Sequence, residues 1–281
     1  MAKDTASTVN QHPAGGTAKS DVEEASSLAP KLIYEVIRRD GEEELQRPNR
    51  SLMWSGIAAG IMISFSVVGE AVLRASLPDA PWRYLVENLG YSLGFMLVIL
   101  GRMQLFTENT ITTVLPVLQK RTLGCFLQMM RLWAIVLGAN VVGAFLIATF
   151  YAHTVALPAD VVAVMGDLSR HAMGINGWDG FVRAIPAGIL VAALVWMLPQ
   201  ARFSSFFVIL VFTWLIAAGD FAHIVAGSVE MAFLAVQGEL GLGGALSFFG
   251  PVFAGNVVGG TVIFALMAWG QVMDEVEPSE S

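Results

Sequence analysis

The sequence has little of the chemistry on which soluble enzymes depend. It contains a single cysteine, Cys125, which excludes an internal disulfide and a cysteine-based metal cluster. Its histidines, at positions 12, 153, 171 and 223, are dispersed, and no H-E-x-x-H or G-x-S-x-G motif accompanies them. No Walker-type glycine loop ending in Lys-Ser or Lys-Thr occurs, which argues against a protein driven by ATP. We therefore predict no enzymatic activity, no cofactor and no metal site.

Charge is also scarce. Of the 281 residues only 14% are charged, whereas 55% are hydrophobic. A soluble domain cannot bury that much apolar side chain, and the apolar runs reach the length of about 20 residues that a helix needs to cross a bilayer. The chain is therefore predicted to be an integral membrane protein. Its net charge is −7, and no nucleic-acid partner is expected.

The hydrophobic residues fall into six segments. These lie at Leu52–Leu73, Leu85–Leu118, Phe126–Ala152, Phe181–Leu198, Phe206–Val236 and Gly244–Trp269. The second and the fifth are too long for one plain span, and each carries a polar interruption. We predict an all-α membrane protein with six transmembrane helices, of which helices 2 and 5 are broken.

Two short echoes indicate that the chain contains two repeats. Asn140-Val141-Val142-Gly143 recurs 116 residues later at Asn256–Gly259, and Ala59–Ile61 recurs at Ala187–Ile189. The offset of 116 also carries Leu105-Phe106-Thr107 onto Phe221-Ala222-His223. Two halves with an interrupted helix in corresponding places are typical of transporters whose broken helices meet near the bilayer midplane. We predict an inverted 3+3 repeat with pseudo-two-fold symmetry.

The interruptions are placed at Arg102–Thr110 and Gly219–Ile224. Bilayer hydrocarbon tolerates non-helical backbone only where protein or a water-filled cavity satisfies the freed N–H and C=O groups. In the first interruption, Thr107, Asn109 or Thr110 can cap the short helix that follows. The half-helix ends are expected to leave unpaired N–H groups near the pore, a favourable setting for an anion. The residues assigned to the two broken-helix loops are Arg102, Gln104, Leu105, Phe106, Glu108, Asn109, Gly219 and Asp220.

Three regions are expected: a cytoplasmic N-terminal segment over 1–50, the membrane domain over 51–272 and an acidic cytoplasmic tail over 273–281. The first region begins with a polar stretch that is expected to be disordered and that contains no apolar run able to serve as a signal peptide. The helical spacing of Leu32, Ile33, Val36 and Ile37 then predicts an amphipathic helix on the membrane surface or on a neighbouring subunit. Short-loop basic residues, such as the pair Lys120-Arg121, favour cytoplasmic termini and an extracytoplasmic connection over 157–180.

One family shares these features. The run Gly94–Thr107, which ends in Leu-Phe-Thr, resembles the second-helix and loop signature of the formate/nitrite transporter family. The break at His223 and the run Gly255–Gly260 resemble that family's fifth and sixth helices, so the resemblance spans about Leu52–Trp269. It implies an aquaporin-like bundle that forms a homopentamer in the inner membrane, with one pore per subunit. The partners that it implies are small monovalent anions, such as formate or nitrite, or their weak acids, together with protons and the lipid bilayer.

The resemblance also implies roles for particular residues. Thr107 and His223 are implied to face each other in the pore centre. Hydrophobic constrictions are implied at Tyr91 and Phe95 on one side, and at Val191 and Ile216 on the other. A proton supplied by the imidazole or by water would let the anion cross as the neutral acid. The pore would then be proton-coupled or pH-gated.

Some positions depart from the family's pattern. The departures are Arg102 and Gln104 before Leu-Phe-Thr, Glu108 after it, Gly188 and Gly227 where asparagine is usual, and His171 with Ala172 where an outer-loop lysine is usual. Because an unpaired charge at membrane depth is costly, we expect Arg102 to form an internal ion pair with Glu108 or with Asp220. Glu230 and Glu239 are placed near the periplasmic end of the fifth helix rather than in a proton path.

Two other functions fit a membrane protein of this kind. A neutral-solute or water channel would carry an Asn-Pro-Ala motif at each broken helix, and neither interruption contains one. A nontransporting membrane scaffold or sensor is the second alternative, since Arg102 and Glu108 could plug the pore. Transport of small anions or their weak acids is the function that the sequence favours.

Overall fold

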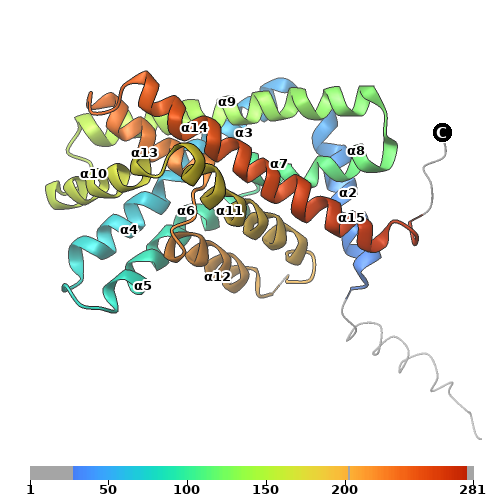
Figure 1. Cartoon of the computed structure of the whole chain (residues 1–281), viewed down its shortest axis with the longest axis horizontal. Coiled ribbons are helices and arrows are strands. Elements are labelled where there is room, and N and C mark those ends of the chain that lie inside the picture. Colours follow the sequence, from blue (N-terminus) through green and yellow to red (C-terminus); the bar gives the residue numbers. More distant parts are fainter. Residues whose placement is uncertain (1–27, 202, 277–281) are drawn as a thin grey trace, which may run out of the picture.

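The computed structural model describes residues 28–201 and 203–276, and these residues form helices and loops without a strand. The expectations for the polar N-terminal stretch and for the end of the acidic tail fall on residues 1–27 and 277–281, which lie outside the described part. The helices run mostly along the long axis of the molecule (Figure 1).

Four helices within the described part are long and apolar enough to cross a bilayer. They are Asn49–Ser76, made of α3 (Asn49–Met62) and α4 (Ser64–Ser76); α9 (Leu123–His153); α11 (Gly177–Met197); and Leu242–Val272, made of α14 (Leu242–Val257), a π-helical stretch (Val258–Ala265) and α15 (Leu266–Val272). They correspond to the first, third, fourth and sixth segments that the sequence predicts. Helix α3 packs against α9, and α11 packs against α14.

The second and fifth predicted segments are each divided into shorter helices. The second contains α5 (Arg83–Glu87), a 3₁₀ turn (Asn88–Tyr91), α6 (Ser92–Leu100), α7 (Phe106–Thr112) and α8 (Val114–Lys120). The fifth contains α12 (Ser205–Ala218) and α13 (Ile224–Val236). Helical structure is absent from 101–105, between α6 and α7, and from 219–223, between α12 and α13. Phe106, Glu108 and Asn109, which were assigned to the first loop, therefore lie in the first turns of α7.

The two non-helical segments have the same backbone geometry, residue by residue. Arg102 and Asp220 adopt left-handed backbone conformations with φ of 51° and 53°, which residues other than glycine rarely adopt. The amide N–H of the next residue reaches back to a carbonyl five residues earlier in both cases, from Met103 to Val98 and from Phe221 to Ile216.

The sequence offset between the two breaks therefore differs from the offset of 116 residues that the echo predicts. Arg102 and Asp220 are 118 residues apart, as are the helix starts at Phe106 and Ile224, rather than 116. The segment between the break and the echoed asparagine is two residues shorter in the second half, which explains the difference. Thr107 thus corresponds to Val225, not to His223, and the equivalence drawn from the echo is wrong.

The echoed asparagines cap the two short helices. Asn140 Oδ1 accepts the backbone N–H of Phe106 at 3.0 Å, and its amide donates to the carbonyls of Gly56 and Gln104 at 2.9 and 2.8 Å. These bonds satisfy backbone groups that a membrane-embedded break would otherwise leave unpaired.

Asn256 repeats the arrangement in the second half. Its Oδ1 accepts the N–H of Ile224 at 2.8 Å, and its amide donates to Ala184 and Ala222 at 2.8 and 3.0 Å. The first N–H of each short helix is therefore bonded to an asparagine side chain, so the expectation of unpaired N–H groups is wrong for Phe106 and Ile224. The predicted capping by Thr107, Asn109 or Thr110 is also replaced, because no side chain of α7 caps its own N-terminus.

The second echo explains how these asparagines reach their positions. A Cβ atom added at Gly60 would collide with the backbone carbonyl of Asn140, and one at Gly188 would collide with that of Asn256. Only glycine lets α3 approach α9, and α11 approach α14, this closely. Gly188 is therefore a packing position where a larger residue does not fit.

A helix that the sequence did not predict lies in the connection between α9 and α11. Helix α10 (Ala159–Gly174) buries Val161, Met165 and Leu168 at helical spacing and packs on α4 and α13. Pro158 immediately before it and this apolar periodicity are the sequence signals for an amphipathic helix. Figure 1 shows α10 and α5 at one end of the bundle and α2 with α15 at the other.

Helix α2 (Pro30–Gln46) is the amphipathic helix expected from the sequence, but it packs on its own chain. Ile33, Tyr34 and Ile37 are buried, and α2 contacts α7, α8 and α15. Glu42 joins the contact, with ion pairs of 2.8 Å to Arg38 and to Lys120 at the end of α8. Burial alone would raise the pKa of Glu42, but the hydrogen bonds and charges of Lys120 and Arg38 lower it on balance.

Replacing either asparagine cap by alanine is expected to destabilise the fold. Asn140→Ala or Asn256→Ala leaves one N–H and two carbonyls without partners inside the bundle, and we expect a loss of about 3 kcal/mol at each site. Thermal unfolding of the detergent-solubilised protein measures the effect. Asn88→Ala is the matched control, since the buried Asn88 side chain bonds locally, to Tyr84, and caps no helix break. Equal losses for all three variants would contradict the capping role.

The ion pair between Lys120 and Glu42 is expected to stabilise the packing of α2 on α8 only at pH values at which Glu42 is ionised. Because the folded pKa of Glu42 is lowered, its contribution is present above the unfolded value and disappears as the pH falls through the folded value. Lys120→Met should reduce hydrogen-exchange protection of the α2 amides by roughly threefold at neutral pH, since both groups are partly exposed.

The control for this measurement is Arg39→Met. Arg39 lies 3.9 Å from Glu35 and its side chain is 74% exposed, so its removal should leave protection of α2 unchanged. Acidification should remove the difference between wild type and Lys120→Met. A difference that persists below the titration of Glu42 would show that the ion pair is not its cause.

Candidate functional site

The ends of the two short helices bring Thr107 and His223 together. Thr107 lies in the first turn of α7, His223 precedes the first residue of α13, and Thr107 Oγ1 and His223 Nε2 are 2.8 Å apart. Both side chains are buried. The asparagine caps position this pair, because each fixes the first turn of one of the two helices.

The hydrogen bonds assign the proton on His223. Its Nδ1 accepts the backbone N–H of Ala226 at 3.3 Å, so in the neutral ring the proton is on Nε2 and is donated to Thr107. Protonation of Nδ1 would break the bond that caps α13. The Thr107 hydroxyl, having accepted from His223, keeps its own proton available for a further acceptor.

Aromatic rings cover the pair on one side. Phe95 meets the His223 ring edge-on with centroids 4.9 Å apart, and Tyr91 lies 5.4 Å from Phe95. These are the two residues predicted for one constriction. Val191 and Ile216, predicted for the other, are fully buried, and neither lines either of the cavities described below.

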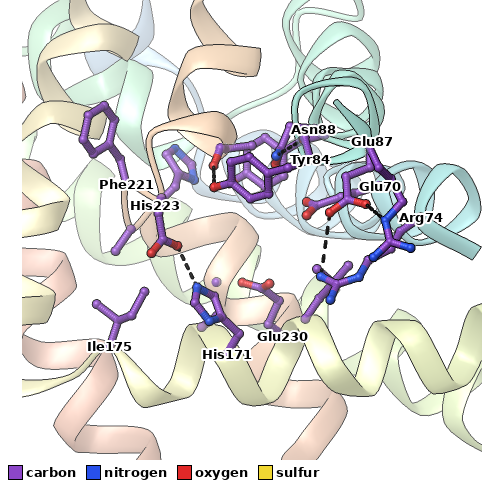
Figure 2. A pocket seen from close by; sticks show the side chains of 18 of the residues that line it. Glu70, Arg74, Tyr84, Glu87, Asn88, His171, Ile175, Phe221, His223 and Glu230 are labelled. Carbon is purple, nitrogen blue, oxygen red and sulfur yellow. Dashed lines mark hydrogen bonds and ion pairs between the residues drawn. The ribbon is translucent and has the colours of Figure 1, made fainter. Parts of the chain in front are cut away.

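A cavity of about 420 Å³ opens at the end of the molecule where α10 lies, and we call it the α10 cavity. It extends inward to His223 and Tyr91 and is walled by α4, α5, α10 and α13. Figure 2 shows charged side chains from several of these elements around it. The wall also includes Gly227, where a Cβ would lie 2.4 Å from the Phe248 ring, so a larger residue there requires that ring to move.

Most charges of the α10 cavity are paired. Glu87 is 3% exposed and contacts Arg74 at 3.8 Å and Arg83 at 3.3 Å, and Arg83 also contacts Asp79 at 3.2 Å. Asp220 pairs with Arg183 of α11 and lies 2.9 Å from His171 Nε2 of α10. The last contact ties α10 to the break that follows α12.

Two carboxylates of this cavity have no such partner. Glu70 of α4 and Glu230 of α13 both line the α10 cavity, and neither makes a hydrogen bond or ion pair within the described part of the chain. Figure 2 shows both among the side chains that line the cavity. Glu230 thus faces the cavity that leads to His223. Glu70 is a lone acidic residue in an apolar span, a signal that sequence reasoning missed.

A second cavity, of about 390 Å³, lies between α2 and the first helix break, and we call it the α2 cavity. Asp40, Glu43 and Glu44 of α2 line it together with Arg102 and Glu108. Burial raises the pKa of Asp40, and the charge of Arg102 partly opposes this rise.

The loop before α7 is tied to α2. Gln104 donates from Nε2 to Glu44 Oε2 at 2.8 Å, and Gln104 Oε1 accepts from Asn109 at 3.1 Å. The predicted ion pair of Arg102 with Glu108 or Asp220 is wrong. Arg102 lines the α2 cavity whereas Asp220 lines the α10 cavity, and Glu108 Oε1 is buried without a hydrogen-bond partner in the described structure.

The buried pair of Thr107 and His223 therefore lies between the two cavities. The α10 cavity reaches His223, and the α2 cavity reaches Glu108, the neighbour of Thr107. One hydrogen-bonded pair and an aromatic ring lie between these two cavities. No group of three or more His, Cys, Asp or Glu residues suited to a metal ion occurs in the described part.

Comparisons with known proteins agree with this arrangement. The family model described as formate/nitrite transporter matches residues 31–270. The chain is 40% identical to the inner membrane protein YfdC of Escherichia coli K12 over 245 residues, 87% of this chain and 79% of that protein. It is 30% identical to the formate channel FocA of Haemophilus influenzae over 188 residues, 64% of this chain and 65% of that protein.

Solved structures show the same fold. A pentameric formate channel with formate bound matches with a TM-score of 0.67 at 21% identity, over 80% of this chain and 98% of that one. An FNT family ion channel matches with a TM-score of 0.76 at 20% identity, over 85% of this chain and 98% of that one. The family comprises channels and transporters rather than enzymes. The chain belongs to the formate/nitrite transporter family.

Proposed function

We propose that the protein carries small monovalent weak acids or their anions, of the formate and nitrite class, across the inner membrane. The observation that carries this proposal is the bond between Thr107 and His223, buried between two cavities at opposite ends of the bundle. Relatives described as formate channels support formate as the first substrate to test.

The proposed architecture has six membrane spans in two inverted halves of three. The second span runs through α6 and α7, and the fifth through α12 and α13, each with its break held by an asparagine cap. The equal geometry of the two breaks supports the repeat. The basic residues near Lys120 favour a cytoplasmic α2 end, so both termini would be cytoplasmic and α10 extracytoplasmic. A homopentamer with one pore per protomer is proposed by similarity to the pentameric neighbour.

The central pair suits a weak acid for a physical reason. A permeant must shed water to pass the closed centre, and a charged species loses far more hydration free energy there than a neutral one. His223 Nε2–H can donate a hydrogen bond to a carboxyl oxygen, and the Thr107 hydroxyl can donate or accept. Proton coupling or pH gating would follow if the acid crossed in its neutral form.

Uptake by proteoliposomes tests the proposal. Formate, nitrite, acetate, lactate and hydrosulfide would be offered at two external pH values, with protein-free liposomes as the control for permeation through lipid. We expect saturable, protein-dependent uptake of at least one of them. Water or glycerol permeation without any weak-acid uptake would favour the neutral-solute channel, and no permeation at all would favour the scaffold or sensor.

His223→Asn is expected to lower weak-acid uptake by roughly tenfold and to flatten its pH dependence. Asparagine is a preferred N-cap residue, so it can replace the bond to Ala226 and keep the fold, but it cannot titrate. Uptake at several pH values and size-exclusion chromatography of the oligomer measure the two effects. An unchanged pH profile at unchanged flux would reject the role of the imidazole.

Thr107→Val tests the other partner at nearly constant volume. The variant loses the acceptor of the His223 bond and the hydroxyl that can contact the permeant, so we expect uptake to fall by about five- to tenfold. Thr213→Val is the matched control, because the buried Thr213 hydroxyl only donates to Ile209 O within α12. A similar loss of uptake in the control would assign the effect to folding.

A further inference from the structure

The last span contains a backbone feature that its counterpart in the first half lacks. Between α14 and α15 lies the π-helical stretch Val258–Ala265, and no other helix within residues 28–201 and 203–276 contains one. The counterpart, α9, is a regular α-helix throughout Leu123–His153. A π-turn is uncommon and is frequently found at functional sites. The contacts of this stretch are therefore a place to look for a functional role.

The π-helical stretch packs on α7, the short helix that carries Thr107 (Figure 1). Thr261 donates from its hydroxyl to the backbone carbonyl of Thr110 at 2.7 Å. A Cβ atom added at Gly260 would collide with the Thr110 hydroxyl, so the π-helical backbone lies directly against this side chain. The Thr110 hydroxyl in turn donates to the carbonyl of Thr107 at 2.7 Å. Thr261 thus holds the turn of α7 that begins at Thr107.

The bond made by Thr261 differs from those of other threonines in the described helices. A threonine inside a helix commonly donates to the carbonyl four residues earlier in the same helix. The hydroxyls that do so here are those of Thr112, Thr113, Thr149 and Thr213. The Thr261 hydroxyl instead bonds to a different helix. Such a bond contributes to the position of the helix that accepts it.

The π-turn accounts for the direction of this bond. Asn256, which caps α13 beside His223, lies five residues before Thr261 on the same span. In a regular α-helix a residue five positions further is rotated by about 140° around the axis. A π-turn takes more residues to complete, so Thr261 is rotated back toward the side on which Asn256 lies. One side of the last span therefore bonds to both short helices, beside His223 and in the turn of Thr107.

The first half has no equivalent of this bond within the described structure. The offset of 118 residues between the breaks carries Thr110 onto Ser228, whose hydroxyl donates to a carbonyl of its own helix, α13. The offset of 116 between the capping asparagines relates Thr261 to Phe145, which has no hydroxyl. The bond from Thr261 therefore acts on one member of the central pair only. Its removal is expected to move Thr107 relative to His223.

We propose that Thr261 is a positioning residue, which holds Thr107 at the place where its hydrogen bond to His223 forms. This inference rests on the proposed transport function. Thr261 lines neither the α10 cavity nor the α2 cavity, so it acts on the permeant through Thr107. Hydrogen bonds tolerate only a narrow range of distance and angle. A small displacement of α7 is therefore enough to weaken the central bond of 2.8 Å.

Formate uptake by proteoliposomes tests the inference, or uptake of another of the five acids if the wild type does not carry formate. Thr261→Val keeps the branched shape and loses the donor, so we expect the maximal rate to fall by roughly fivefold. The half-saturating concentration should change by less than about twofold, because neither cavity is altered. Thr261→Ser restores the hydroxyl and should stay within about twofold of wild type. Thr213→Val, which removes a bond within α12, is the control.

A double-mutant cycle separates positioning from a purely structural role. Thr107→Val removes the group that Thr261 positions, so adding Thr261→Val to it should lower uptake by less than about twofold further. Two independent effects would instead multiply to a loss of roughly 25- to 50-fold. Thermal unfolding of the four proteins shows whether lost stability contributes to either result.

Gly260→Ala perturbs the same contact without touching the Thr261 hydroxyl. The added Cβ must displace the Thr110 side chain, and we expect uptake to fall by on the order of tenfold. In the Thr107→Val background it should add less than about twofold. Gly250→Ala in α14 is the matched control, because a Cβ there meets nothing within 4 Å.

The outcomes distinguish this inference from the transport proposal. Wild-type uptake that falls in Thr107→Val but not in Thr261→Val would overturn the positioning role and leave the transport proposal standing. A multiplicative loss in the double variant would also overturn it, because Thr261 would then act independently of Thr107. No uptake of any of the five acids by wild type would reject the transport proposal itself, and this inference with it.

Discussion

Two asparagine side chains stabilise the interrupted backbone at the centre of the structure. A bundle of apolar helices cannot accept a break in the backbone unless the freed groups find partners inside the protein. Asn140 and Asn256 each supply one acceptor and two donors to the same three kinds of backbone group. They do so from helices that Gly60 and Gly188 allow to approach closely. The starts of α7 and α13, and with them Thr107 and His223, follow from these contacts.

The sequence predicted much of this framework, but not the number of residues that separates the two helix breaks. The four-residue echo was a sound signal because it contains the asparagine caps, and the second echo contains the glycines that they pack against. The offset between echoes could not give the offset between breaks, since the two differ by two residues. That difference depends on the path between break and cap, and hydropathy does not report it.

Pairing of charges was the part that sequence reasoning could not supply. Arg102 and Glu108 are close in sequence, yet they form no ion pair. The left-handed backbone at Arg102 and the helix that starts at Phe106 separate the two side chains. Asp220 instead binds Arg183 and His171, which come from two other helices. Helix α10 could have been recognised from its apolar spacing, but not its contact with Asp220, which depends on how α10 packs over α4 and α13.

The central hydrogen bond also sets a condition on any molecule that passes. Thr107 and His223 satisfy each other when nothing is bound, so a permeant must replace that bond as well as leave water. A neutral carboxylic acid can do both, because its carbonyl accepts from Nε2–H and its hydroxyl donates to the threonine oxygen. An anion can accept from both Nε2–H and the threonine hydroxyl, but it loses far more hydration free energy than the neutral acid when it enters the buried centre. Dehydration, rather than hydrogen bonding, is therefore the term that distinguishes the two protonation states at the centre.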